Sequence, residues 1–440
     1  MSKTCFPANE SCRLETGTTG GAKHNMSKTP FRALAHRNFR LYILGQGVSI
    51  IGSWMQLVAM AWLVYELTGS SLWLGLTGFA GQIPALFLTP LAGCLIDRLD
   101  RRRLLFFTQT MSMVQALVLA YLTLSGTVEA WHVVALSFVL GLANAFDIPT
   151  RQSFLSELVG KGPDLANAIA INSSVFNGAR LLGPALAGLL LALTSPGVCF
   201  LTNAVSYLAV LAALGAMRLP ARALPVGRGR LFSGLREGLA YAWRSAPIRT
   251  LLLLIGVFNM AGMAETTLLP IVTTAILHGA AEALGFLSAA AGLGAFTAAL
   301  FLASRRSVPD LDRWIAAAPV LFGSALVAFS FANTMWAAAL LLTTTGFALL
   351  LMTAAANTVL QTIVHEDKRG RIVSLYSMMV TGLAPVGGLL AGLVADRMGA
   401  AWTLRIAGLC CLAASVPFAV QFYRQQINGA GESPIGVRIG

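Results

Sequence analysis

The chain has 440 residues, of which 56% are hydrophobic and 11% are charged, and it carries a formal net charge of +13. Its mean hydropathy of +0.72 excludes a soluble globular protein, because so few charged residues cannot cover a surface of this size. The positive charge falls between apolar segments, where it sets orientation and meets anionic headgroups, so we expect the lipid bilayer and no nucleic acid as a partner. The six cysteines show neither metal-ligand spacing nor a disulfide framework, so no metal site is predicted.

The N-terminal tail, residues 1–38, is polar and lacks the apolar core of a signal peptide. We therefore expect it to stay in the cytoplasm, with the first apolar span as an uncleaved signal anchor. Met1-Ser2-Lys3-Thr4 recurs as Met26-Ser27-Lys28-Thr29, so either methionine is a candidate start.

Twelve apolar segments follow, each near the roughly 20 residues that a helix needs to cross a bilayer. They predict an all-α membrane protein with twelve transmembrane helices in two sets of six. The first set covers 40–66, 72–96, 103–125, 131–153, 166–194 and 197–217. The second set covers 249–276, 283–303, 312–330, 334–363, 371–395 and 401–423.

Basic residues alternate between the loops. The loop from Asp97 to Arg103 contains four arginines, whereas the turns 66–71 and 126–132 contain no Lys or Arg. An excess of Lys and Arg marks cytoplasmic loops. Both termini are therefore predicted to lie on the cytoplasmic side.

The longest connection joins the two sets, runs from Arg218 to Arg249 and contains seven arginines. Within it, Leu231 to Trp243 forms an amphipathic patch that either lies along the headgroups or belongs to a solvated linker. The predicted divisions of the chain are a tail 1–38, an N-terminal half 39–217, a linker 218–248, a C-terminal half 249–424 and a tail 425–440.

The two halves resemble each other, as expected of a transporter that arose by duplication. A shift of 204 residues places Gly178, Gly183 and Gly188 on Gly382, Gly387 and Gly392. In addition, Gly93-x-x-x-Asp97-Arg98 and Gly392-x-x-x-Asp396-Arg397 end spans on opposite sides of the membrane. Inverted three-helix repeats within each half produce that pattern.

The stretch from Gly93 to Arg102, GCLIDRLDRR, resembles the signature between helices two and three of the major facilitator superfamily. The resemblance implies that fold and a cytoplasmic gate loop formed by Gly93, Asp97, Arg98, Arg101 and Arg102. A plain orientation signal is the alternative for each arginine. Asp100 replaces the usual glycine, and because Asp tolerates a left-handed turn, we expect the loop to form.

Three further stretches narrow the resemblance: DIPTRQSF at 147–154, LANAIA at 165–170 and GRIVSLYS at 370–377. Together they look like the enterobactin-exporter and macrolide-efflux branch of the superfamily, over residues 31–424, which implies export. Gly178, Gly183, Pro184 and Gly188 in span five are similar to a helix-packing motif associated with proton antiporters. As the alternative, this is a packing face without directional meaning.

The arginine that many drug and proton antiporters carry in helix four is missing, because Ser137 occupies that position. Proton coupling, if it occurs, must therefore use other groups.

Polar residues inside the spans mark a cavity or an interhelical contact. Gln46, Ser49, Ser53 and Gln56 share one face of the first span, and Thr353, Asn357 and Gln361 share one face of span ten. Ser374, Ser377 and Thr381 repeat the pattern in span eleven. The residues predicted to line the substrate cavity are Gln46, Ser49, Ser53, Gln56, Asn144, Arg180, Glu265, Thr353 and Asn357.

Only a few charged residues are embedded within the spans, away from their ends: Asp147, Arg180, Glu265 and Arg405. Glu265 lies near the centre of its span, where an ionised carboxylate is costly, so it is the candidate for proton coupling or cation binding. A statically protonated or paired glutamate is the alternative. Arg180 is its expected partner or an anion-binding group. Asp147 pairs with Arg151 at helical spacing, near the predicted cytoplasmic boundary, which favours a structural role or a gate latch.

No enzyme signature is present, because the five histidines have no ligand spacing and no phosphate-binding loop occurs. We expect a monomeric transporter of the bacterial inner membrane that exports a small amphipathic drug or siderophore-like molecule by alternating access. It needs no cofactor, and the proton gradient supplies the energy. A solute importer of the same fold and a non-transporting scaffold or receptor are the alternatives.

Overall fold

The structure is a computed structural model and describes residues 31–96, 99–160, 162–218, 239–304, 311–364 and 366–427. It contains only helices in these ranges. The first set is a short 3₁₀ turn η1 (Arg32–Ala35), α1 (Arg37–Thr68), α2 (Ser71–Ile96), α3 (Arg101–Leu124), α4 (Ala130–Val159), α5 (Pro163–Leu193) and α6 (Pro196–Ala216). The second set is α8 (Ala246–Ile271), η2 (Val272–Ile276), α9 (Ala281–Ser304), α10 (Leu311–Phe329), α11 (Met335–Ile363), α12 (Glu366–Ser377), η3 (Met378–Gly382), α13 (Ala384–Met398) and α14 (Ala400–Ile427).

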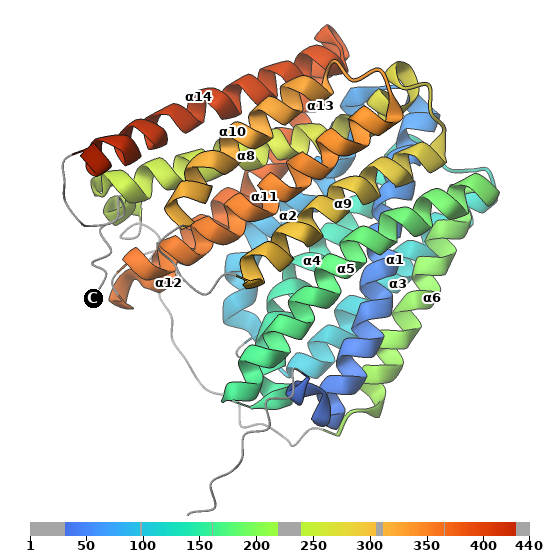
Figure 1. Cartoon of the computed structure of the whole chain (residues 1–440). Coiled ribbons are helices and arrows are strands. Elements are labelled where there is room, and N and C mark those ends of the chain that lie inside the picture. The colour runs from blue at the N-terminus through green and yellow to red at the C-terminus, as the bar shows by residue number, and fades with distance from the viewer. Residues whose placement is uncertain are drawn as a thin grey trace, which may run out of the picture.

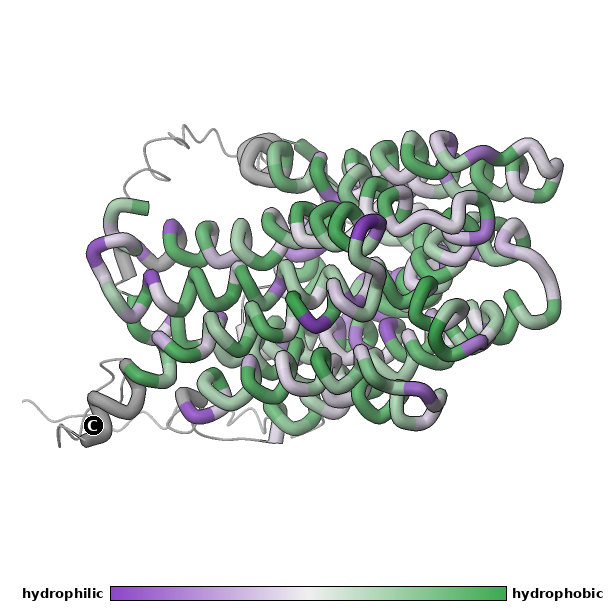
Figure 2. The backbone as a smooth tube through the Cα atoms, turned by 90° about the horizontal axis from the view of Figure 1, so that it is seen from above, coloured by the Kyte–Doolittle hydropathy of each residue, from purple (hydrophilic) through white to green (hydrophobic). Residues whose placement is uncertain are grey.

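Eleven described helices are long and apolar enough to cross a membrane, and α10 contains a shorter apolar helix over Arg313–Phe329. Hydrophobic residues cover most of the helical tube in Figure 2. The chain is therefore a multi-pass membrane protein by length and composition. The predicted division at residues 217 and 249 remains a prediction, as does most of the amphipathic patch 231–243, because residues 219–238 lie outside the described part.

Helix ends follow local sequence signals. Pro163 and Pro196 stand in the first turns of α5 and α6, where a missing N–H costs nothing. The side chain of Asp100 accepts a hydrogen bond from the Arg103 backbone N–H at 3.0 Å and so caps α3. Gly69 ends α1 with a φ of 61°, a left-handed conformation that glycine adopts freely.

Two predicted spans are irregular, and both belong to the second set. Five-residue π-helical turns, η2 and η3, follow α8 and α12. Leu383 then joins η3 to α13, so the predicted span 371–395 is a helix in two parts. Pro270 and Pro385 lie beside these irregular turns, and proline cannot donate the backbone hydrogen bond of a regular helix.

The two sets meet at one end of the bundle and diverge at the other (Figure 1). We call the end where α6 finishes and α8 begins the linker end, and the end with the turns 69–70 and 194–195 the short-turn end. The sets touch at the short-turn end, where a Cβ on Gly75 of α2 would lie 2.8 Å from the Gly388 carbonyl oxygen of α13. A hydrophobic core that includes Met55 to Val64 of α1 continues there into the second set.

Candidate transport cavity

A cavity of about 220 Å³ lies inside the first set of helices, which we call the N-half pocket. All four residues of the polar stripe predicted in the first span line it, and so does Asn144 of α4. The complete lining is Gln46, Ser49, Ile50, Ser53, Trp54, Gln56, Leu57, Met60, Gln109, Ser112, Leu140, Asn144, Asp147, Arg151, Phe176, Asn203 and Tyr207.

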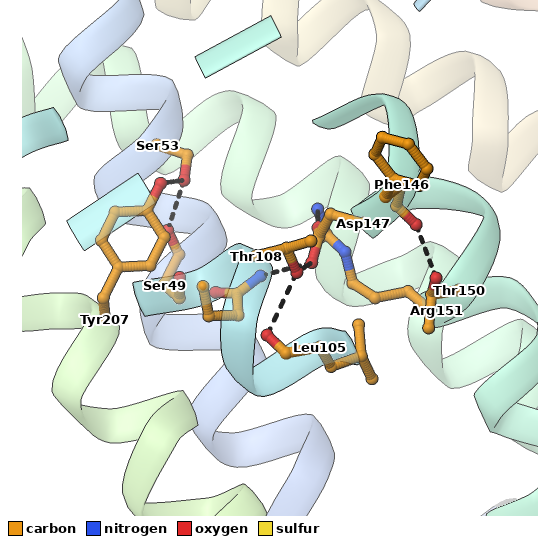
Figure 3. A network of polar contacts seen from close by, with 10 residues as sticks. Ser49, Ser53, Leu105, Thr108, Phe146, Asp147, Thr150, Arg151 and Tyr207 are labelled. Carbon is orange, nitrogen blue, oxygen red and sulfur yellow. Dashed lines mark hydrogen bonds and ion pairs between the residues drawn. The ribbon is translucent and has the colours of Figure 1, made fainter. Parts of the chain in front are cut away.

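Asp147 is the central charged group of this pocket and is only 2% exposed. Its Oδ1 accepts hydrogen bonds from Thr108 Oγ1 at 3.0 Å and Gln109 Nε2 at 2.7 Å, both of α3. Its Oδ2 forms an ion pair with Arg151, one turn further along α4 (Figure 3). The pair neutralises both charges, and the hydrogen bonds from Thr108 and Gln109 join α3 to α4.

A second network joins α1, α3 and α6. Gln56 Nε2 donates to Gln115 Oε1 at 3.0 Å, and Asn203 Nδ2 donates to Gln56 Oε1 at 2.7 Å. Nearby, the hydroxyls of Ser53 and Tyr207 lie 3.3 Å apart (Figure 3). Gln56 therefore contributes to interhelical hydrogen bonding as well as to the pocket lining. Both roles predicted for polar residues inside the spans apply to it.

Aromatic and cationic groups stand beside the pocket. Trp54 of α1 packs edge-on against Phe176 of α5 with ring centroids 5.9 Å apart. The Arg180 guanidinium carbon lies 5.7 Å from the centre of the Trp54 ring, a distance that allows a cation–π contact. Arg180 thus has an aromatic partner from its own half of the molecule.

Glu265 of α8 is 6% exposed and is the buried carboxylate of the second set, within the residues described. Its Oε1 accepts a hydrogen bond from Thr345 Oγ1 of α11 at 3.0 Å, and its Oε2 has no hydrogen-bond partner. Glu265 lies eleven residues before Ile276, the end of that helical segment. Eleven residues span about 16 Å, so Glu265 is near the middle of a bilayer core of about 30 Å.

Arg180 is the residue that the sequence predicts as the partner of Glu265. Of the ion pairs that the structure contains between described residues, none joins these two. The backbone of Arg180 packs against Gly292 of α9, where a Cβ would lie 2.6 Å from the Arg180 carbonyl oxygen, and its side chain lies over Trp54.

The polar residues of α11 are not part of the N-half pocket. Thr353 Oγ1 donates to the Leu349 carbonyl at 2.8 Å within its own helix, and the Tyr376 hydroxyl donates to the Thr353 carbonyl at 2.7 Å. Asn357 Oδ1 accepts from Gln361 Nε2 at 3.0 Å, one turn further along. Thr353 and Asn357 thus form hydrogen bonds mainly within α11 and with Tyr376 of span eleven.

The packing motif of span five makes two close contacts. A Cβ on Gly183 would overlap the side chain of Trp54, and one on Gly188 would lie 3.0 Å from the Cα of Gly285 in α9. The carbonyl oxygen of Pro184 lies 2.8 Å from a Cβ built on Gly285. Gly178, by contrast, has open space around its Cβ position, so the close approach begins at Gly183.

The gate-loop residues are partly described. Gly93 lies in α2, and Asp97 and Arg98 fall outside the described residues. Arg102 donates to the carbonyls of Leu214 and Gly215 at 2.7 and 2.9 Å, at the carboxyl end of α6, where a cation is favourable. Arg101 forms an ion pair with Glu157 of α4 at 3.5 Å. Asp100 has a φ of −66° and caps α3, so the expected left-handed turn is not formed at this residue.

Asp147 lies further from the end of its helix than the sequence predicted. The predicted span ended at residue 153, but α4 continues past Pro149 to Val159, which places Asp147 twelve residues inside the helix. Asn203 and Tyr207 were missed because nothing local distinguishes them from ordinary packing residues of α6.

The geometry described so far is that of a helical membrane protein with two polar, buried sites between its helices. The profile of the family described as transmembrane secretion effector matches residues 28–430. The chain belongs to this family of the major facilitator superfamily. Members of the superfamily are transporters, which agrees with the resemblance carried by the gate loop.

Individual relatives cover most of the chain. The staphyloferrin A transporter of Staphylococcus aureus is 27% identical over 84% of this chain and 92% of its own length. The multidrug efflux pump Tap of Mycolicibacterium fortuitum is 27% identical over 79% of this chain and 87% of its own. The macrolide efflux protein A of Streptococcus pyogenes is 21% identical, covering 85% and 93%.

Solved structures show the same fold at low sequence identity. The nucleoside transporter NupG has a TM-score of 0.67 at 13% identity, covering 87% of this chain and 98% of its own. A bacterial homologue of the human lysosomal transporter Spinster, in an inward-facing and occupied conformation, has a TM-score of 0.64 at 14% identity and covers 89% and 97%.

Proposed function

We propose that the protein is a secondary active transporter that exports a small amphipathic molecule, a drug or a siderophore-like metabolite, in exchange for protons. The observation that carries this proposal is Glu265, a carboxylate with one unpartnered oxygen near the middle of a transporter fold. An ionisable group at that depth is costly and is normally retained for function. The relatives named as efflux pumps support export.

The proposed cycle uses the two ends of the bundle in turn. In the present state the helix sets touch at the short-turn end and are apart at the linker end (Figure 1). The arginines of the loops support a cytoplasmic position for the linker end, and in the proposal this state admits substrate from inside. Rocking of the halves then closes the linker end and opens the other.

Glu265 couples protons to this motion in the proposal. Its Oε2 is free to take a proton, while Thr345 holds Oε1. Because Glu265 and Arg180 belong to opposite halves, rocking changes the distance between their charges. Proton uptake and release are thereby linked to the change of state, with no cofactor and with the proton gradient as the source of energy.

The topology belongs to the same proposal. We infer twelve spans, with α10 as the ninth, and both termini and the linker in the cytoplasm. The protein then lies in the bacterial inner membrane as a monomer. Small amphipathic molecules and lipids are its partners.

The test is retention of dyes, macrolides and catecholate siderophores in efflux-deficient cells that express the chain, with and without a protonophore. We expect at least one compound to be retained less, and both the protonophore and Glu265→Gln to abolish that difference. Glu282→Gln is the matched control, because Glu282 is exposed in the first turn of α9. Export that survives Glu265→Gln and the protonophore contradicts the coupling, and uptake along a gradient favours an importer.

A further inference from the structure

The N-half pocket has hydrogen-bonding groups that the protein itself leaves unused. The Ser49 hydroxyl and the Gln109 Oε1 are buried without a hydrogen-bond partner. Gln46, which is 2% exposed, and Asn144 likewise make no hydrogen bond to any described part of the chain. Buried polar groups are normally satisfied. The two buried groups without a partner, together with Gln46 and Asn144 on the same cavity, therefore point to a ligand or to water.

The charge of the pocket selects among ligands. Its acid and its base, Asp147 and Arg151, form an ion pair with each other, and Thr108 and Gln109 occupy the other carboxylate oxygen. A charged ligand would have to break this pair, which is unfavourable in a buried site. The free groups are hydroxyl and amide, which donate to and accept from uncharged polar groups equally well.

The size and polarity of the pocket set how much of a ligand enters. A volume of about 220 Å³ is below the roughly 300–1,000 Å³ of sites that enclose a drug-sized molecule. The lining includes apolar residues, and two of them, Leu57 and Phe176, are exposed. The exposed residues mark the opening, so a ligand would insert its polar end and leave an apolar body against Trp54, Leu57 and Phe176.

We propose that the N-half pocket binds the uncharged polar end, bearing hydroxyl or amide groups, of the exported molecule. This inference rests on the proposed export function and deepens it, because it assigns substrate selection to the first set of helices alone. Glu265, in the second set, then has no part in holding that end. Selectivity and proton coupling are divided between the two halves.

The test is direct binding to the purified full-length protein in lipid nanodiscs. The first probe is radiolabelled chloramphenicol, which is uncharged and bears two hydroxyls and an amide, and the second is tetraphenylphosphonium, a cation without hydrogen-bonding groups. We expect chloramphenicol to bind the wild type, and Ser49→Ala or Gln46→Leu to weaken its binding about five- to tenfold each, the loss of one hydrogen bond. Binding of tetraphenylphosphonium should not respond to these changes.

The matched control is Ser137→Ala. Ser137 of α4 is 1% exposed and its hydroxyl also lacks a partner, but it does not line the pocket. We expect it to bind chloramphenicol as the wild type does, and size-exclusion chromatography of every variant monitors folding. Chloramphenicol that fails to bind the wild type, or that binds Ser49→Ala and Gln46→Leu unchanged, overturns the subsite and leaves a water-filled pocket.

The binding experiment tests the pocket and does not test proton-dependent export. Proton-dependent export is judged by dye retention and Glu265→Gln, and it can hold while the pocket binds nothing. If chloramphenicol binds through Ser49 but no compound in the panel is exported, the subsite stands and the export function fails.

Discussion

At the scale of single residues, the two buried carboxylates of the described chain differ in their partners. Asp147 has three, namely Thr108, Gln109 and Arg151, whereas Glu265 has one hydroxyl. Each oxygen of Asp147 is held by a neighbouring side chain, whereas Glu265 Oε2 has no hydrogen-bond partner and is available to take a proton. This contrast supports the proposal that Asp147 has a structural role and that Glu265 couples protons to transport.

The Asp147–Arg151 pair leads to a stability prediction. Asp147→Asn or Arg151→Met alone leaves a buried charge without its counter-ion, which costs about 3–5 kcal/mol in the free energy of unfolding. The double variant should lose less than the sum of the two. Titration with SDS, followed by circular dichroism of the purified protein, measures this.

Glu265→Gln serves as the comparison in that titration. It removes the charge but keeps an acceptor for Thr345, so we expect a change of about 1 kcal/mol or less. If the double variant loses as much free energy of unfolding as the two single variants together, Asp147 and Arg151 are not energetically coupled.

At the scale of elements, glycines set how closely the two halves approach. Gly188 of α5 meets Gly285 of α9, and Gly392 of α13 meets Gly75 of α2, whose Cα lies 3.2 Å from a Cβ built on Gly392. Small residues allow this approach, because helices in lipid associate by packing. Both contacts lie at the short-turn end, so they stabilise the state that is closed there.

A methyl group at this contact should disturb transport. In Gly285→Ala the new Cβ overlaps the backbone of Gly188, which forces α5 and α9 apart. We expect at least a tenfold lower export rate for the compound identified in the retention test. Gly178→Ala is the control and should stay within twofold of the wild type, because its Cβ enters open space. Wild-type export by Gly285→Ala would show that the halves close elsewhere.

At the scale of the whole molecule, the two halves are apart at the linker end, which carries the basic loops, and touch at the short-turn end (Figure 1). The linker end carries Arg101 and Arg102, which bind α4 and α6 of their own half. These contacts lie within the first set of helices. The opposite end is joined across the halves by Ser70, whose hydroxyl donates to Asp396 at 3.2 Å.

Orientation is directly testable with alkaline phosphatase, which needs disulfides and is active only outside the cytoplasm. A fusion in the turn 126–129 should be active, and fusions in the linker 218–248 should be inactive, because the positive loops stay inside. A cytoplasmic reporter such as β-galactosidase should give the reverse pattern. Activity of the phosphatase in the linker would invert the proposed state and the direction of transport.

Much of the fold could be predicted from the sequence alone. The apolar segments gave helix bounds within about six residues, because hydropathy and length act locally along the chain. The gate loop identified the superfamily, and the profile match confirmed it. The polar stripe of α1 was assigned to a cavity from its spacing alone, since residues one turn apart share a helical face.

The tertiary structure alone decided which groups meet. It brought Asp147 together with Thr108 and Gln109, paired Arg180 with Trp54, and separated Arg180 from Glu265 beyond ion-pair contact. It also placed the polar stripe of α1 in a pocket within one half. These outcomes depend on how helices cross and how far α4 continues past a proline, which are set by packing between segments distant in sequence, and local patterns carry no information about that packing.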